Sequence, residues 1–390
     1  MSYAPPISLA VYLSAVAVSL VAIVLGAAIC RVLRVAGWLA PVLGLSAAMV
    51  VALAAVRLPG ETWAAVVALA AALVVAGAVL VRSGIDRREA RVAAAAGIPV
   101  ALILLAACSL PFVAYGEIGE LGPGYSPDPF FHMGEADAMR SVGLDAGVIT
   151  AGYPIGPHAL VATLGLGLGV ATEPLFLGLL LAIPVLAGLT ALAGLGDLAP
   201  GRRVVAAVLV GLPYLPASYF VQGSFKEPIF AACFLCCALV VRDARRLTRP
   251  DVGALAAIVL ATAGGAVAFG WPALAWPAAM LVVYGLLAAP KDALQSVLTR
   301  SGTRRRLVSV AAFATFVAVV LAVAAQASGF FDGAGQYIFA EGIGGNFVGQ
   351  LSPFEAVGTW PATDFRYRPE GHPLLFSVVV AYYVSRAVLG

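Results

Sequence analysis

Charged residues are scarce in this chain of 390 residues, because Asp, Glu, Lys and Arg together make up only 11% of it. A soluble domain is about one-quarter charged and about half apolar, whereas 62% of this chain is apolar and its mean hydropathy is +1.00. A water-soluble protein of this size could not bury so many apolar side chains. The composition therefore excludes a soluble enzyme, a disordered chain and a nucleic-acid-binding protein, and leaves an integral membrane protein.

Cysteine is also scarce, and all five cysteines lie in apolar runs rather than in loops with metal-ligand spacing. Cys233, Cys236 and Cys237 could be read as a CxxC-type motif, but on an apolar helix we interpret them as packing residues. The apolar runs are long and do not alternate with polar residues, which excludes a β-barrel. The predicted fold class is therefore an all-α polytopic membrane protein.

About eleven segments are long and apolar enough to cross a bilayer, for which a helix needs about 20 residues. The predicted spans are residues 8–30, 38–56, 62–81, 93–114, 174–195, 204–221, 228–241, 252–269, 272–289, 307–327 and 373–389. Residues 1–92 form an N-terminal extension of three spans, and residues 93–390 form the main transmembrane module. Because the chain stops at the end of its last span, the sequence leaves open whether a further C-terminal part follows.

The few charged residues separate by side of the membrane. One set of loops carries 18 of the 23 basic residues, and these loops are predicted to be cytoplasmic. They hold Arg31, Arg34, Arg82, Arg87, Arg88, Arg91, Arg202, Arg203, Arg242, Arg245, Arg246, Arg249, Lys291, Arg300, Arg304, Arg305, Arg306 and Arg386. The opposite loops carry 14 of the 20 acidic residues and all three histidines. We therefore expect a multi-pass plasma-membrane protein whose chemistry lies on the non-cytoplasmic face.

Two outer loops are long, from about residue 115 to 173 and from about 328 to 372, and long ordered loops usually carry function. The segment from His158 to Val170 within the first loop is apolar but too short to span. We predict that this segment forms a helix lying in the membrane interface.

The first outer loop contains the run Ser126-Pro-Asp-Pro-Phe-Phe-His-Met-Gly-Glu-Ala-Asp-Ala-Met-Arg140. Asp128 lies between two prolines and is suited to cap a helix that starts at Pro129. Helical spacing then places His132, Glu135 and Met139 on one face, with Phe131 and Met133 toward lipid. A functional role for Asp128 is favoured, and an ordinary capping role is the alternative.

Two further motifs lie at the outer ends of predicted helices. The run Tyr153-Pro-Ile-Gly-Pro-His158 is a rigid turn that ends in a histidine, and we interpret His158 as a contact for a substrate phosphate or a metal. In Gln222-Gly-Ser-Phe-Lys-Glu227, the charges of Lys226 and Glu227 lie close to membrane depth, where charges are costly and usually functional. An intrahelical salt bridge or snorkelling to the interface is the alternative for this pair.

The second long outer loop combines polar and aromatic residues. It runs Leu351-Ser-Pro-Phe-Glu355-Ala-Val-Gly-Thr-Trp360-Pro-Ala-Thr-Asp364-Phe-Arg366-Tyr-Arg368. Such a composition is typical of a flexible flap over a sugar or lipid headgroup, and an ordinary solvated loop is the alternative.

These motifs resemble the GT-C superfamily of membrane glycosyltransferases, and most closely the catalytic subunits of oligosaccharyltransferases and their bacterial and archaeal relatives. Asp128-Pro-Phe-Phe-His132 with Arg140 is similar to the motif in the first outer loop of that family. Tyr153-Pro-Ile-Gly156 is similar to its Tyr-Pro-x-Gly turn before an interfacial helix. The resemblance implies that Glu227, and Glu355 or Asp364, are the later acids that help to bind metal and substrate.

The resemblance implies an enzyme that transfers a sugar from a polyprenyl-phosphate donor. The sequence lacks the family's Asp-x-Asp pair in the second outer position and its soluble Trp-Trp-Asp domain, so the implied acceptor is a lipid, glycan or cell-wall polymer. Asp128 would be the catalytic base, with inversion, and a Mg²⁺ or Mn²⁺ ion would be held by Asp128, Glu227 and His158. The implied substrate and phosphate contacts are His132, Arg140, Tyr153, Lys226, Glu355, Asp364 and Arg366.

Two other functions remain open at this point. A transporter or flippase of a lipid-linked saccharide could have the same topology, although transporters usually place polar groups near the middle of the membrane. A non-catalytic scaffold related to the same superfamily is the third candidate. It would be indicated if Asp128, His158 and Glu227 lay far apart in the fold.

Overall fold

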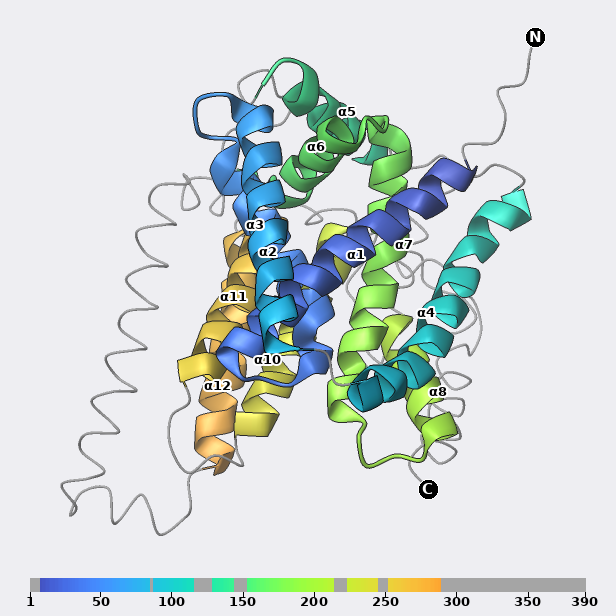
Figure 1. Cartoon of the computed structure of the whole chain (residues 1–390), viewed down its shortest axis with the longest axis vertical. Helices are drawn as coiled ribbons and strands as arrows, with labels where there is room; N and C mark the ends of the chain where they lie inside the picture. The colour runs from blue at the N-terminus through green and yellow to red at the C-terminus, as the bar shows by residue number, and fades with distance from the viewer. Residues whose placement is uncertain are drawn as a thin grey trace, which may run out of the picture.

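The computed structural model describes residues 8–84, 87–115, 128–143, 153–213, 223–244 and 252–288, and every regular element in these ranges is helical. The helices are α1 (Ser8–Leu33), η1 (Gly37–Leu39), α2 (Ala40–Ala55), α3 (Glu61–Ser83), α4 (Arg87–Tyr115), α5 (Asp128–Ser141), α6 (Gly156–Leu168), α7 (Thr172–Ala191), η3 (Leu192–Gly194), α8 (Pro200–Gly211), α10 (Lys226–Ala244), α11 (Val252–Phe269), η4 (Trp271–Leu274) and α12 (Ala275–Ala288). The predicted all-α class is confirmed for this part of the chain (Figure 1).

Six helical segments in the described residues are long and apolar enough to cross a membrane. They are Leu9–Leu33, Gly37–Ala55, Glu61–Ser83, Ala90–Leu110, Thr172–Gly194 and Val252–Phe269. Each coincides with a span predicted from the sequence, so a helical membrane protein is confirmed. Of the other five predicted spans, three overlap α8, α10 and α12, and those at 307–327 and 373–389 lie outside the described residues. The total of eleven stays a prediction.

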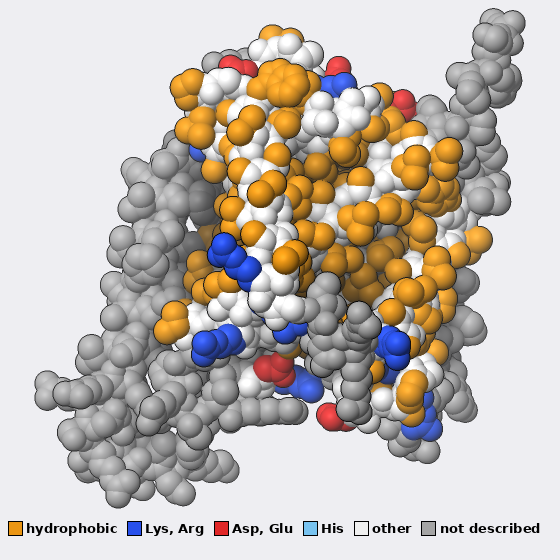
Figure 2. Space-filling view, in the orientation of Figure 1, with side chains coloured by type: hydrophobic (Ala, Val, Ile, Leu, Met, Phe, Trp, Pro, Cys, Tyr) orange, Lys and Arg blue, Asp and Glu red, His pale blue; other side chains and the backbone are white. Residues whose placement is uncertain are grey.

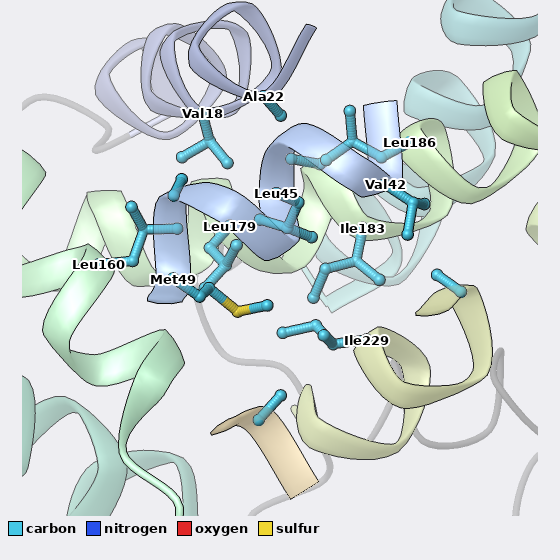
Figure 3. Close-up of a cluster of buried hydrophobic side chains, with 14 of the residues drawn as sticks. Val18, Ala22, Val42, Leu45, Met49, Leu160, Leu179, Ile183, Leu186 and Ile229 are labelled. Carbon is cyan, nitrogen blue, oxygen red and sulfur yellow. The ribbon is translucent and has the colours of Figure 1, made fainter. Parts of the chain in front are cut away.

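The centre of the bundle is the packing of α1, α2 and α7 (Figure 3). Helices α1 and α2 come into backbone contact where two glycines meet. A Cβ atom on Gly44 would overlap the carbonyl oxygen of Ala22, and one on Gly26 would overlap the carbonyl oxygen of Ala40. Small residues permit this close approach in membranes, where helices associate through packing rather than through a hydrophobic driving force.

Helix α7 is enclosed by protein, whereas α3 and α4 lie at the periphery. All residues of the spanning window of α7 are buried, compared with 17% for α3 and 28% for α4. The outer surfaces of α3 and α4 carry exposed aliphatic side chains such as Val74, Val75 and Leu102. Side chains of this kind cover much of the face drawn in Figure 2. A peripheral helix that is apolar on its exposed face is suited to lipid contact.

The two ends of the bundle differ in charge. We call the end that carries α5 and α6 the upper end, because it lies at the top of Figure 1. The last turns of α1, α3 and α10 and the start of α8 lie at the opposite, lower end, with Arg31, Arg82, Arg242 and Arg203. Basic side chains gather toward this lower end in Figure 2. The structure therefore separates the charges as the sequence predicts, with the candidate site at the upper end.

Helix α6 occupies the position of the predicted interfacial helix, but it is covered by protein. Every residue from Gly156 to Gly165 is buried, and α6 packs against α2, α3, α5, α7 and α11. This burial could not be predicted, because apolar composition is the same whether lipid or protein surrounds the helix. The position of α6 at the membrane interface stays a prediction.

Candidate functional site

Helix α5 turns one face toward the bundle. His132, Glu135 and Met139 on this face are 9%, 3% and 1% exposed, whereas Phe131 is 53% exposed. The predicted face of α5 is therefore confirmed. Met133 was predicted to face lipid, but it is partly buried and packs against the core. It follows His132 directly and so lies at the edge of the buried face rather than opposite it.

The turn before α6 brings His158 into the protein interior. Helix α6 begins at Gly156 with Pro157 in its first turn, a position that suits proline because its nitrogen needs no hydrogen-bond partner there. A Cβ atom on Gly156 would lie 2.7 Å from the carbonyl oxygen of Val267 in α11. The glycine therefore lets α6 start against α11, and His158 in the same first turn is 0% exposed.

Four side chains from α5, α6, α10 and the turn before α6 form one hydrogen-bonded chain. The ammonium of Lys226 donates to the hydroxyl of Tyr153 and lies 4.3 Å from the centroid of its ring. The Tyr153 hydroxyl is 3.4 Å from Nε2 of His132. Nδ1 of His132 is 3.0 Å from Nε2 of His158. These four residues, with Phe225, are called the upper-end cluster below.

Phe225 forms the apolar wall of the upper-end cluster. It is fully buried, and its ring meets His132 and His158 edge to face, with centroids 4.9 and 5.4 Å apart. A second edge-to-face contact, at 5.1 Å, joins it to Phe176 of α7. Aromatic rings in this geometry fix one another's orientation and exclude water. The hydrogen bonds of the cluster therefore form beside an apolar surface, where they are stronger than in water.

The burial of His158 holds it in the neutral form. Loss of hydration lowers the pKa of His158 well below its ordinary value, and the positive charges of His132 and Lys226 lower it further. Neutral imidazole has one donor and one acceptor nitrogen. His158 therefore serves as a neutral dipole in the cluster.

The donors and acceptors in this series of hydrogen bonds fit one direction, from Lys226 toward His158. Lysine can only donate, so the hydroxyl proton of Tyr153 points toward Nε2 of His132. Nδ1 of His132 then carries a proton and donates to Nε2 of His158, which leaves the His158 proton on Nδ1. This assignment follows from the network as a whole. Nδ1 of His158 is buried and has no hydrogen-bond partner among the residues that the structure describes, so the chain ends in an available polar atom.

Two side chains of α5 fasten it to the start of α7. Arg140 donates through Nη1 to the carbonyl oxygen of Val170 at 2.6 Å. Asp137 accepts a hydrogen bond from the hydroxyl of Thr172 at 2.7 Å. The sequence predicts Arg140 as a phosphate contact, and the structure places its guanidinium on the backbone that follows α6. Its phosphate role stays a prediction, while its bracing contact is a finding.

The start of α3 braces the far end of α5. The hydroxyl of Thr62 donates to the carbonyl oxygen of Met139 at 2.6 Å. The carboxylate of Glu61 packs against Gly143, where a Cβ atom would overlap it. Gly143 has a φ of +109°, a conformation that side chains disfavour. Both requirements favour glycine at this position, and the C-terminal end of α5 is thereby held by the start of α3 as well as by the start of α7.

The structure describes the other predicted site residues to different extents. Asp128 is the first residue of α5, one helical turn before His132, and its side chain lies outside the description. Glu227 follows Lys226 in the first turn of α10 and is partly buried. Glu355, Asp364 and Arg366 lie outside the described residues. Their predicted roles stay predictions.

The predicted divalent cation does not find a complete set of ligands among the described side chains. In the described part of the chain, no group of three or more His, Cys, Asp and Glu is placed to hold a metal ion. Nε2 of His158, the predicted ligand, is hydrogen-bonded to His132. A site for Mg²⁺ or Mn²⁺ would require the carboxylate of Asp128, so the metal stays a prediction and no step below depends on it.

Two residues of the site were not predicted from the sequence. Phe225 directly precedes Lys226, so its position in the motif could have indicated it. Thr172, which binds Asp137, opens an apolar span and carries no signal of its own. Comparisons of this chain with protein-family models, with curated proteins and with solved structures found no match.

Proposed function

We propose that this protein is an inverting membrane glycosyltransferase that uses a polyprenyl-phosphate sugar as donor at its upper end. The observation that supports this most directly is the upper-end cluster, in which Lys226, Tyr153, His132 and His158 are joined by hydrogen bonds. The cluster lies one helical turn from the start of α5, where the predicted base Asp128 stands. Sugar transfer from a phosphate requires a cation for the leaving group and a base for the acceptor.

The phosphate is the group that must be stabilised as the glycosidic bond breaks. Polyprenyl phosphate leaves with the bonding electron pair, so negative charge grows on its oxygen. A fixed cation in a site that excludes water stabilises such charge far more than it would in water. Lys226 would supply this charge. The Tyr153 ring beneath its ammonium and the His132–His158 pair behind the Tyr153 hydroxyl would hold it in place.

The reaction also needs a base that takes a proton from the acceptor. A hydroxyl oxygen of a lipid, glycan or cell-wall acceptor forms the new bond to the anomeric carbon, and its proton passes to the carboxylate of Asp128. Attack opposite to the leaving phosphate inverts the anomeric centre. Asp128 opens α5, whose C-terminal end is fastened to α3 and to the start of α7. His132, one turn after Asp128, is held by His158, and such support helps to position a catalytic group.

We further propose that the complete chain crosses the plasma membrane about eleven times, with the upper end on the non-cytoplasmic side. The concentration of arginines at the lower end supports this orientation. A long-chain lipid donor would then reach the upper-end cluster sideways from the outer leaflet.

A transporter is the strongest competing function, and the distribution of charge argues against it. In the six candidate spans of the described residues, Arg31, Glu61, Arg82, Arg91 and Glu173 are the only Asp, Glu, Lys and Arg residues, and all lie within three residues of a span end. Transporters usually bind their cargo at mid-membrane polar groups.

The test is sugar transfer by purified full-length protein in proteoliposomes, with a panel of radiolabelled polyprenyl-monophosphate sugars. We expect one donor to be consumed with release of polyprenyl phosphate, and Asp128→Asn to abolish the release. Arg57→Gln is the matched control, because Arg57 is an exposed cation between α2 and α3. Its activity should equal that of the wild type.

Two results would contradict the proposal. Release of polyprenyl phosphate by Asp128→Asn at the wild-type rate would eliminate Asp128 as the base. Movement of the intact labelled donor across the bilayer, without release of polyprenyl phosphate, would indicate a flippase instead.

A further inference from the structure

Helix α5 at the upper end of the bundle has three different sides (Figure 1). The side with His132 is buried against the bundle. Helical spacing places Gly134, Asp137 and Ser141 on the opposite side, where all three are exposed, and Phe130 of the first turn shares that side. Apart from Phe130, this opposite side is suited to contact with water.

The third side of α5 is apolar and open. Phe131, Ala138 and Val142 are separated by seven and four residues, so they share one side of the helix. Phe131 is 53% exposed, Val142 is 71% exposed, and Ala138 is partly buried. Val142 directly follows α5, and its amide continues the helical pattern by donating to the carbonyl oxygen of Ala138 at 2.8 Å. We call these three residues the apolar flank of α5.

The contacts of α5 with α7 show which way the apolar flank points. Arg140 and Asp137 bind Val170 and Thr172 at the start of α7. Helical spacing places Met133 on the same side as these two residues, which explains why it packs against the core. The apolar flank lies on the other side of α5, about half a turn away from Arg140. It therefore points away from the start of α7.

The contact of α5 with α3 shows the level of the flank in the membrane. Thr62 in the first turn of α3 binds the carbonyl oxygen of Met139, so the end of α5 lies level with the start of this candidate span. The next residue, Trp63, is 61% exposed. Tryptophan at the end of a span marks the boundary between lipid and water. The end of α5 therefore lies at this boundary, beside the lipid-facing surface of α3.

We propose that the apolar flank of α5 lies in the upper leaflet, against the parts of the acyl chains next to the headgroups. An amphipathic helix at a membrane surface buries its apolar side about 5–10 Å into this layer and keeps its polar side in water. The flank extends the lipid-facing surface of α3 beyond the start of that helix.

This depth would have a consequence for the start of α5, where Asp128 stands. That end of the helix would lie at the level of the headgroups, which is also the level of the phosphate of a lipid-linked substrate. The inference itself rests on the confirmed membrane helices and not on the glycosyltransferase proposal, so the two can fail separately.

The experiment measures the surroundings of nitroxide spin labels on the full-length protein in proteoliposomes. Labels are attached to Phe131→Cys and Val142→Cys, and their collisions with oxygen, which concentrates in lipid, are compared with those of a water-soluble nickel chelate. We expect the ratio of oxygen to nickel collisions to be several times higher at both positions than at Ser141→Cys. It should approach the ratio at Val74→Cys on the lipid-facing surface of α3, where Val74 is 72% exposed.

The controls come from the same chain. Ser141→Cys lies next to Val142 but on the polar side of α5, so it separates immersion of one side from immersion of the whole helix. The five native cysteines are buried, and label-treated wild type gives the background signal. All four substituted side chains are exposed, so each variant should keep the melting temperature of the wild type.

Two results would overturn the inference. Ratios at Phe131→Cys and Val142→Cys as low as that at Ser141→Cys would place the flank in water. Few collisions with either reagent at these two positions would show that protein, and not lipid, covers the flank. No sugar donor is added, so an absence of sugar transfer by this protein would not affect the measurement.

Discussion

The upper and lower ends of the bundle use their polar side chains in opposite ways. At the upper end, Lys226, Tyr153, His132 and His158 bind one another through side chains. At the lower end, arginine side chains bind the backbone. Arg203 donates to the carbonyl oxygen of Leu192 at 3.1 Å, and Arg242 donates to that of Gly194 at 2.5 Å.

We interpret this difference as a structural use of charge at the lower end, and we propose a functional use at the upper end. The carbonyl groups at the end of α7 and η3 carry the negative pole of the helix, so arginines that bind them stabilise the fold. The upper-end cluster satisfies no helix end. It joins a partly buried cation to two buried imidazoles. The predictions below test this contrast, starting with the largest expected effect.

Removing one cation from each end should have different consequences. We expect Lys226→Gln to lower the rate of sugar transfer at least 100-fold, because the growing phosphate charge loses its fixed partner. Arg242→Gln should retain the rate per folded molecule and lower the melting temperature instead. The measurements are donor turnover in proteoliposomes and thermal denaturation of both variants. An equal loss of rate in Lys226→Gln and Arg242→Gln would contradict the proposed difference between the two ends.

Low pH should lower the stability of the fold through His158 of the upper-end cluster. The pKa of His158 is lowered in the folded protein, so at low pH only the unfolded chain binds this proton. Stability is then unaffected above the ordinary histidine pKa of about 6.5 and falls below it, by up to about 1.4 kcal/mol per pH unit. Melting temperatures between pH 7.5 and 5 measure this slope. His158→Gln should flatten it, whereas Arg242→Gln should shift the whole curve and keep its slope.

The brace between α5 and α7 should contribute about as much as one ordinary hydrogen bond. Thr172→Val removes the hydroxyl that binds Asp137, and we expect a loss of about 1 kcal/mol in stability. Turnover should fall modestly through the position of α5, with no change in the pH slope. Thr172→Ser, which keeps the hydroxyl, should behave as the wild type. A full loss of activity in Thr172→Val would contradict a purely bracing role.

The smallest effect is expected for Arg203 at the lower end. Arg203→Lys keeps the charge but loses the planar group that covers Trp38. Such a contact contributes about 0.5–1 kcal/mol at an exposed site, so the melting temperature should drop by only a few degrees. Turnover should be unchanged. A change in turnover would link the lower end to the reaction and break the comparison.

Hydropathy predicted where the helices of this protein begin and end, but it did not predict whether protein or lipid surrounds each helix. The span predicted at 252–269 coincides with α11, because Pro250 and Gly270 interrupt the apolar run at both sides. The burial of α6 was not predictable, because lipid and protein interior are equally apolar. In a soluble protein an exposed face would be polar, and the same reasoning would have succeeded.

The candidate site could be predicted as a set of residues but not as a network. His132, Tyr153, His158 and Lys226 were each identified from charge and proline patterns in the sequence. Their contacts depend on how α5 folds onto α6 and α10, which no local pattern encodes. His158 illustrates the gap, because its contact with His132 was not predicted. Its predicted contact with a substrate phosphate or a metal stays a prediction.

The touching backbones of α1 and α2 have a mechanical consequence. Two helices that meet at Gly26 and Gly44 cannot slide or rotate past each other without backbone collision. These helices therefore form a fixed frame. A lipid that enters the bundle must therefore do so without separating α1 from α2, and we expect the distance between Gly26 and Gly44 to stay the same with and without a bound donor.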